Sequence, residues 1–179
     1  MFAIFLTSGL FLGWSLGAND AANVFGTAVG TRMISFKKAA ILSGIFVILG
    51  AVISGAGAAR TLGELGAVNA IAGAFVVALA AAITVYWLTV LGYPVSTTQA
   101  IVGAIIGWDL FSGALIDYGS LEAIVLSWVI SPVLAAIFSA LLYKVIAYGI
   151  TNARIHMFRL DAMTRAGLIL AGIAGAYSL

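Results

Sequence analysis

The sequence predicts an all-α membrane protein, a polytopic helical bundle that includes a broken helix or a re-entrant hairpin. Of the 179 residues, 64% are hydrophobic and only 8% are charged, and the mean hydropathy is +1.21. A soluble domain carries about 25% charged residues, so this composition excludes an ordinary soluble domain. The absence of cysteine excludes disulfides, thiolate metal sites and cysteine nucleophiles.

Four apolar stretches are long enough to cross a bilayer, because a helix needs about 20 residues to span the hydrocarbon core. They are residues 2–16 with their continuation, 39–58, 70–91 and 121–143. A fifth stretch, 94–108, is shorter and begins with a polar cluster. We expect it to form a discontinuous helix or one limb of a re-entrant hairpin within segment 92–117.

The distribution of charge predicts a multi-pass topology in the cell membrane, because basic residues gather in cytoplasmic loops. Loops 31–38 and 148–165 are basic and are therefore expected in the cytoplasm, with the N-terminus outside. The acidic residues that follow the fifth stretch are interpreted as solvated charges of an outer loop; they are Asp109, Asp117 and Glu122. This arrangement requires segment 92–117 to make a net crossing, which gives about five crossings.

The order of segments suggests one repeat and the beginning of another. Residues 1–147 would form the first repeat, 148–165 a basic linker or interfacial helix, and 166–179 the start of a second repeat. A solvated loop is an equal alternative for the linker. The last run has 14 residues and reaches only about 21 Å, and its "AGIAGAYSL" echoes "LFLGWSL" at 10–16. We therefore expect an inverted-repeat transporter of which this chain is the first half.

The first polar cluster is "SLGANDAANVFGTAVG", residues 15–30, directly after an apolar run. An ionisable group at bilayer depth costs about 2.5–3.5 kcal/mol, so Asp20 is a functional-site candidate by default. Asn19 and Asn23 add further hard oxygen ligands for a cation. The surrounding glycines and alanines are expected to interrupt the helix so that backbone and carboxylate can meet an ion. Close packing through Gly26 and Gly30 is the structural alternative.

The second polar cluster is "GYPVSTTQAIVGAIIG", residues 92–107. Pro94 suits the first turn of a new helix. The hydroxyls and the amide that follow would gather at a helix start whose free N–H groups and positive dipole end bind oxyanions; they belong to Ser96, Thr97, Thr98 and Gln99. Ordinary N-capping is the structural alternative.

The positions of the basic residues favour coupled transport. All eight are placed in loops or at span ends: Arg32, Lys37, Lys38, Arg60, Lys144, Arg154, Arg159 and Arg165. An anion at the membrane midplane would therefore meet no ammonium or guanidinium group, and helix dipoles supply only about half a charge each. Cations bound together with the anion would be needed, which predicts cation-coupled anion symport.

Two other classes compete with a transporter. An ion channel is suggested by "TVLGYP" at 89–94, which is similar to a potassium filter, but Leu91 interrupts it and Pro94 replaces the final glycine. An enzyme is not expected, because the H-E-x-x-H and G-x-S-x-G patterns are absent and no second membrane-depth carboxylate is predicted to pair with Asp20.

At the two polar clusters the sequence resembles the inorganic phosphate transporter (PiT) family, in "GANDAANVFGTAVG" and "PVSTTQAIVGAIIG". The resemblance implies phosphate symport, mostly with sodium, at a site between two inverted repeats. By position it implies sodium ligands and phosphate ligands: Asn19, Asp20 and Asn23 for sodium, and Asp20, Asn23, Ser96, Thr97, Thr98 and Gln99 for phosphate. Many members carry His in place of Gln99, so no protonation role is transferred.

The resemblance leaves the substrate and the coupling ion open. Sulfate is the rival substrate and the proton the rival coupling ion, because a helix terminus recognises tetrahedral oxyanions in general. No cofactor other than sodium ions is implied. The expected partners are the lipid bilayer and the missing second half, with a homodimer left open and nucleic acid excluded.

Overall fold

The computed structural model describes residues 2–66, 68, 71–152 and 156–179. Within them the chain forms six helices: α1 (Phe2–Gly30), α2 (Phe36–Leu65), α3 (Ile71–Val90), α4 (Thr97–Ser112), α5 (Tyr118–Asn152) and α6 (Met157–Ser178). The described residues contain no strand, so the predicted all-α class is confirmed. Among the described residues, three helical segments are long and apolar enough to cross a membrane: Phe36–Gly57, Ile71–Val90 and Tyr118–Asn152.

Helix α1 is continuous through the first polar cluster, so the predicted interruption is wrong. No proline precedes Pro94 in the sequence, so every residue of α1 keeps a backbone N–H group. Glycine inside a helix costs only about 1 kcal/mol relative to alanine. The small residues instead line a groove of about 610 Å³ between α1 and α2, with Gly17, Ala21 and Gly26 on one wall and Ala40 and Gly44 on the other.

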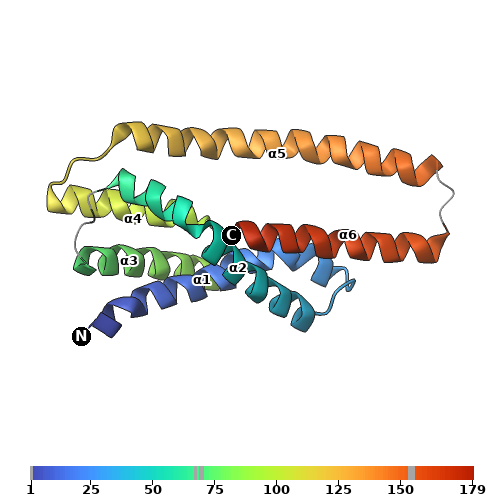
Figure 1. The fold of residues 1–179 in the computed structure, drawn as a ribbon, viewed down its shortest axis with the longest axis horizontal. Coiled ribbons are helices and arrows are strands. Elements are labelled where there is room, and N and C mark those ends of the chain that lie inside the picture. The colour runs from blue at the N-terminus through green and yellow to red at the C-terminus, as the bar shows by residue number, and fades with distance from the viewer. Residues whose placement is uncertain (1, 67, 69–70, 153–155) are drawn as a thin grey trace.

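The chain breaks between α3 and α4, at residues 91–96. Gly92 has a φ of +82°, a conformation that side chains with a Cβ rarely adopt. Helix α4 begins at Thr97, with Ser96 as its N-cap, so the expectation that Pro94 lies in the first turn is wrong. The two helices pack side by side and run in opposite directions (Figure 1), which gives a helical hairpin with its tip at 91–96.

Several helices extend beyond their predicted ends. Arg60 lies inside α2, where its side chain faces Glu64 at 3.9 Å and both are exposed, and Lys144 lies inside α5. Residues 157–165 are helical, which corrects the loop alternative for that part of the linker; Arg154 lies outside the described residues. The run 166–179 is not a separate short segment, because all but its last residue belongs to the 22-residue helix α6.

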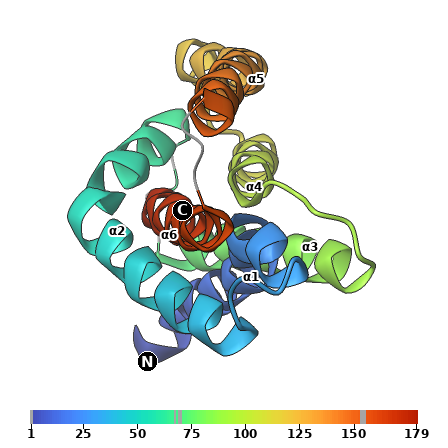
Figure 2. The same ribbon diagram turned by 90° about the vertical axis from the view of Figure 1, so that its right-hand side faces the viewer.

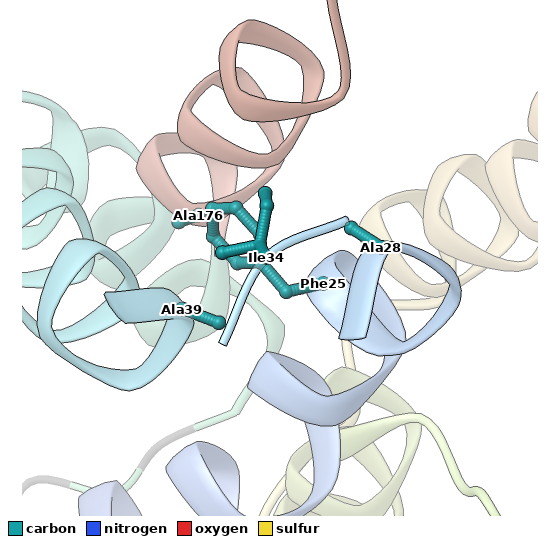
Figure 3. Packing of buried hydrophobic residues seen from close by; sticks show 5 residues of the cluster. All are labelled: Phe25, Ala28, Ile34, Ala39 and Ala176. Atoms are coloured by element: carbon teal, nitrogen blue, oxygen red, sulfur yellow. The ribbon is translucent and has the colours of Figure 1, made fainter. Parts of the chain in front are cut away.

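Two buried clusters hold the helices together. The first joins α1, the turn after it, α2 and α6 (Figure 3) through Phe25, Ala28, Ile34, Ala39 and Ala176. The second joins the end of α2 to the hairpin through Leu65, Val77, Val102 and Ile105. Helix α6 lies between α2 and α1, whereas α5 runs along the edge of the bundle with no buried residue in Tyr118–Asn152 (Figure 2).

The crossing of α2 and α6 generates the first prediction. A Cβ at Gly50 would collide with the backbone carbonyl of Tyr177, which cannot rotate away. We expect Gly50→Ala to lower the stability by about 1–3 kcal/mol, because overpacking forces the helices apart. Thermal unfolding in detergent measures this effect. Gly55→Ala on the same helix meets no atom within 4 Å and should be neutral; equal losses in both variants would contradict the prediction.

The start of α5 generates a prediction about pH. The pKa of Asp117 is lowered from its usual 3.8, first by the hydrogen bond from the Ser120 hydroxyl and then by that from the Gly119 N–H group. A lowered pKa in the folded state stabilises the protein above pH 3.8 and ceases to do so as the pH falls through the folded value. The difference in melting temperature between wild type and Asp117→Ala should therefore shrink at acid pH. A difference that stays constant down to pH 3 would refute this role.

Candidate functional site

The two polar clusters meet where α1 passes the hairpin tip, and Asn19 is the residue that joins them. Its side chain is only 5% exposed. The amide nitrogen donates to the carbonyl of Val95 and to Asp20 Oδ1 at 2.8 Å. The amide oxygen accepts from Thr89 Oγ1 at 3.3 Å and from the Val95 N–H group at 3.4 Å. The Thr89 hydroxyl has one proton and also donates it to the Val85 carbonyl at 2.7 Å, so three of the four hydrogen-bonding positions of the Asn19 amide are fully used and one position on the amide oxygen is only shared.

Asp20 is partly buried and connects α1 directly to the start of α4. Thr97 Oγ1 donates to Asp20 Oδ2 at 2.8 Å, and Thr97 is 5% exposed. With the bond from Asn19, each carboxylate oxygen has one partner. An ionised carboxylate offers about four acceptor positions, so capacity for a further donor or a cation remains.

The other predicted ligands lie around this pair, with their side chains exposed. Ser96 caps α4 by accepting from the Gln99 N–H group at 3.3 Å, so capping accounts for this hydroxyl. Thr98 and Gln99 follow on the first turn, and Asn23 lies one turn beyond Asn19 on α1. Asn23 lines a cavity of about 290 Å³ together with Asn19, Thr89, Tyr93 and Pro94.

The geometry provides a negative group and a positive helix end in contact. The N-terminus of α4 carries about half a positive charge and free N–H groups. Neither the hydrogen-bond partners of Asn19 and Asp20 nor the residues that line the adjacent cavity include a basic side chain. The seven described basic residues are all exposed. This arrangement suits an oxyanion bound together with cations.

Sequence reasoning missed two of the groups that bind Asn19, and it misplaced Asp109. Thr89 and the backbone of Val95 bind Asn19, and only the position of Thr89 just before the break could have indicated its role. Asp109 was expected in a solvated loop, but it lies within α4 and is 0% exposed. It is therefore a buried carboxylate rather than the predicted solvated loop charge, and it belongs to the far end of the hairpin. His156, which occupies the N-cap position of α6 without a side-chain capping bond, and Trp14 are exposed and lie outside the site.

A helical membrane protein whose helical hairpin places a hydroxyl-rich helix start against a carboxylate has features that recur in the binding sites of secondary transporters. The comparison with known protein families identifies the particular transporter family. A description of the phosphate transporter family matches residues 16–174, and the chain belongs to that family. The matched region includes both polar clusters, so the family resemblance seen in the sequence is confirmed.

Similar proteins come from distant organisms. A protein of Pyrococcus abyssi named "Putative phosphate permease" is 35% identical over 151 residues, covering 79% of this chain and 37% of that protein. "Inorganic phosphate transporter 2-1, chloroplastic" of Arabidopsis thaliana is 36% identical, covering 83% and 27%. A Chlamydia pneumoniae protein with the same name as the first is 32% identical, covering 94% and 41%. The chain spans less than half of these relatives, and no solved structure matches it.

The Asn19 network predicts a stability effect that is separate from any activity. Replacing Asn19 by Ala leaves the hairpin tip and Asp20 without their partner. We expect a loss of about 1–3 kcal/mol, because buried polar groups would be left unsatisfied. Asn23→Ala, one turn away and exposed, is the matched control for thermal unfolding in detergent and should lose less than half as much. Equal melting temperatures for Asn19→Ala and wild type would disprove an anchoring role.

Proposed function

We propose that this chain is the first half of a carrier that moves inorganic phosphate across the membrane in symport with sodium ions, by alternating access. The observation that supports it most is the Thr97–Asp20 hydrogen bond, which joins the two family signature stretches at one point. A second half, in the same gene product or in another chain, would complete the site over Asn23, Thr98 and Gln99, whose side chains are exposed. A homodimer is compatible with this arrangement.

Electrostatics supports cation coupling. Phosphate carries more than one negative charge near pH 7, and the N-terminus of α4 offers about half a positive charge. Asp20 adds a negative charge at the same place. Sodium ions at Asn19, Asp20 and Asn23 would balance both, since carboxylate and amide oxygens are hard ligands of the kind that alkali cations take in transporters. No resident cofactor enters this proposal.

The site favours phosphate over sulfate through hydrogen bonding. Phosphate keeps a proton near neutral pH and can donate it to a carboxylate, whereas sulfate cannot. Asp20 has acceptor capacity left after its bonds to Asn19 and Thr97. A bound sulfate would leave that capacity unused. Proton coupling remains the alternative to sodium.

The orientation follows from the positive-inside rule. The exposed basic residues Arg32, Lys37 and Lys38 flank the turn between α1 and α2, and Arg159 and Arg165 lie on the first half of α6. Placing both regions in the cytoplasm puts the N-terminus outside the cell membrane and the open ends of the hairpin on the outer side. The tip then lies within the bilayer if the hairpin re-enters, and at the cytoplasmic surface if α3 and α4 each cross fully.

Uptake by proteoliposomes that contain the full-length gene product tests the function. We expect radiolabelled phosphate to accumulate only with an inward sodium gradient and to be displaced weakly by sulfate. Asp20→Ala should abolish sodium-dependent uptake, because it removes the charge that holds the cation. Asp161→Asn, an exposed acid that pairs with Arg165, is the control and should transport normally. Flux driven by voltage without phosphate would indicate a channel, and unchanged uptake in Asp20→Ala would remove this residue from the mechanism.

Thr97→Val tests whether the Thr97 hydroxyl contributes to the affinity for phosphate. It removes the donor to Asp20 and a hydroxyl at the start of α4, so we expect the KM for phosphate to rise about tenfold, which corresponds to about 1.4 kcal/mol. Thr84→Val, which removes an exposed hydroxyl bonded within α3, should leave KM unchanged. An unaltered KM in Thr97→Val would assign Thr97 to structure alone.

A further inference from the structure

Asp109 is a buried carboxylate at the opposite end of α4 from the proposed substrate site. Its side chain is 0% exposed, and neither carboxylate oxygen has a hydrogen-bond partner among the described residues. Buried carboxylates are normally hydrogen-bonded, paired with a cation or bound to a metal, because an unpaired buried charge is very costly. The side chain therefore requires a partner that the described residues do not supply.

The immediate surroundings of Asp109 are apolar and tightly packed. Its Oδ2 atom lies directly against Gly66, where an added Cβ would collide with both Asp109 and Ile105. Leu65 and Ile105 belong to the second buried cluster, and Trp108 packs against it. A glycine at this position lets the carboxylate come up to the backbone of α2, whereas any larger residue would push it away.

Two helix ends meet at this carboxylate. Asp109 lies in the last turn of α4, where its own carbonyl accepts from the Gly113 N–H group, and Gly66 is the C-cap of α2. The last four carbonyls of a helix have no partner within it, and the C-terminus carries about half a negative charge. The Leu65 carbonyl accepts one long bond of 3.3 Å from the Asp117 N–H group. The carboxylate and both helix ends thus concentrate negative charge at one buried point.

The neighbouring charged side chains do not neutralise it. On α2, Arg60 faces Glu64 and is exposed, and on α5 the exposed Glu122 adds a further negative charge nearby along the chain. On α3, residues Ile71–Val90 include no charged residue. Among the described residues no cationic side chain neutralises this carboxylate, and a mobile cation is a partner that would suit a site between two helix ends.

We propose that Asp109 binds a monovalent cation of the sodium class, with main-chain carbonyl oxygens at the ends of α2 and α4 as the other ligands. Carbonyls at helix C-termini coordinate sodium in transporters. The described residues provide no group of three acidic or histidine side chains that would suit a divalent ion. Asp109 lies twelve residues after Thr97 on the same helix, about 18 Å away. The site is thus separate from the one proposed at Asp20 and does not depend on its function.

The ion would hold α2 against the hairpin. When it is bound, the ends of α2 and α4 and the carboxylate attract a common positive charge. When it leaves, the same groups repel one another and weaken the contact between the two elements. Sodium would therefore stabilise the fold from a place that the substrate does not touch.

Thermal unfolding of the full-length gene product in detergent tests this site, in NaCl against choline chloride at equal ionic strength. The comparison uses Asp20→Asn as the background, so that sodium binding at the other site does not contribute. We expect NaCl to raise the melting temperature of Asp20→Asn by at least about 3 °C. The double variant Asp20→Asn/Asp109→Asn should lose this gain, and Asp20→Asn/Glu122→Gln, which removes an exposed acid in the same region, should keep it.

Three results would overturn the proposal. The first is an Asp20→Asn protein that does not respond to sodium, and the second is a gain that persists in the Asp109 variant. The third is an equal gain from acidification in choline chloride with none added by sodium, since a proton would then satisfy the carboxylate. If Asp109→Asn does not fold, Asp109→Leu replaces the carboxylate by an apolar side chain of similar volume. Loss of the sodium response in this variant would support the site at Asp109, and retention would overturn it.

Discussion

The bond pattern around Asn19 is the constraint on which the rest of this structure depends. A chain that turns at membrane depth leaves backbone N–H and C=O groups without water to bind them, and each unsatisfied group costs several kcal/mol. Asn19 bonds both the N–H and the C=O group of Val95, in the way that a neighbouring backbone would. One side-chain amide thereby ties the break between α3 and α4 to α1.

This anchoring explains why α1 is continuous. An amide can hold a hairpin tip only if its own backbone is fixed, and a helix fixes it better than an unwound segment. Asp20 follows directly, and the same rigid helix sets its distance to Thr97. The continuous helix α1 therefore both holds the hairpin tip through Asn19 and positions the carboxylate of Asp20 against the start of α4. The site requires no strained backbone in α1.

The small residues of the first cluster have a consequence for packing rather than for unwinding. Gly17, Ala21 and Gly26 leave a groove between α1 and α2 beside the polar site. Small residues also allow other helices of the bundle to approach closely. Gly172 of α6, for example, leaves room for the ring of Phe25 on α1. In lipid, where apolar side chains gain little by leaving their solvent, such close contacts supply much of the association energy between helices.

The sequence by itself determined the membrane class, the apolar character of the helical segments, the break near Pro94 and the pairing of the two polar stretches in one family pattern. These follow from composition, hydropathy and local chemistry, which do not depend on distant contacts. Only the tertiary structure decided that α1 continues through Asn19 and Asp20, since glycine and alanine are compatible with either outcome. The tertiary structure also decided that Asp109 is buried, because its burial depends on where α2 ends in space. No local sequence pattern around residue 109 indicates that Gly66 lies against it.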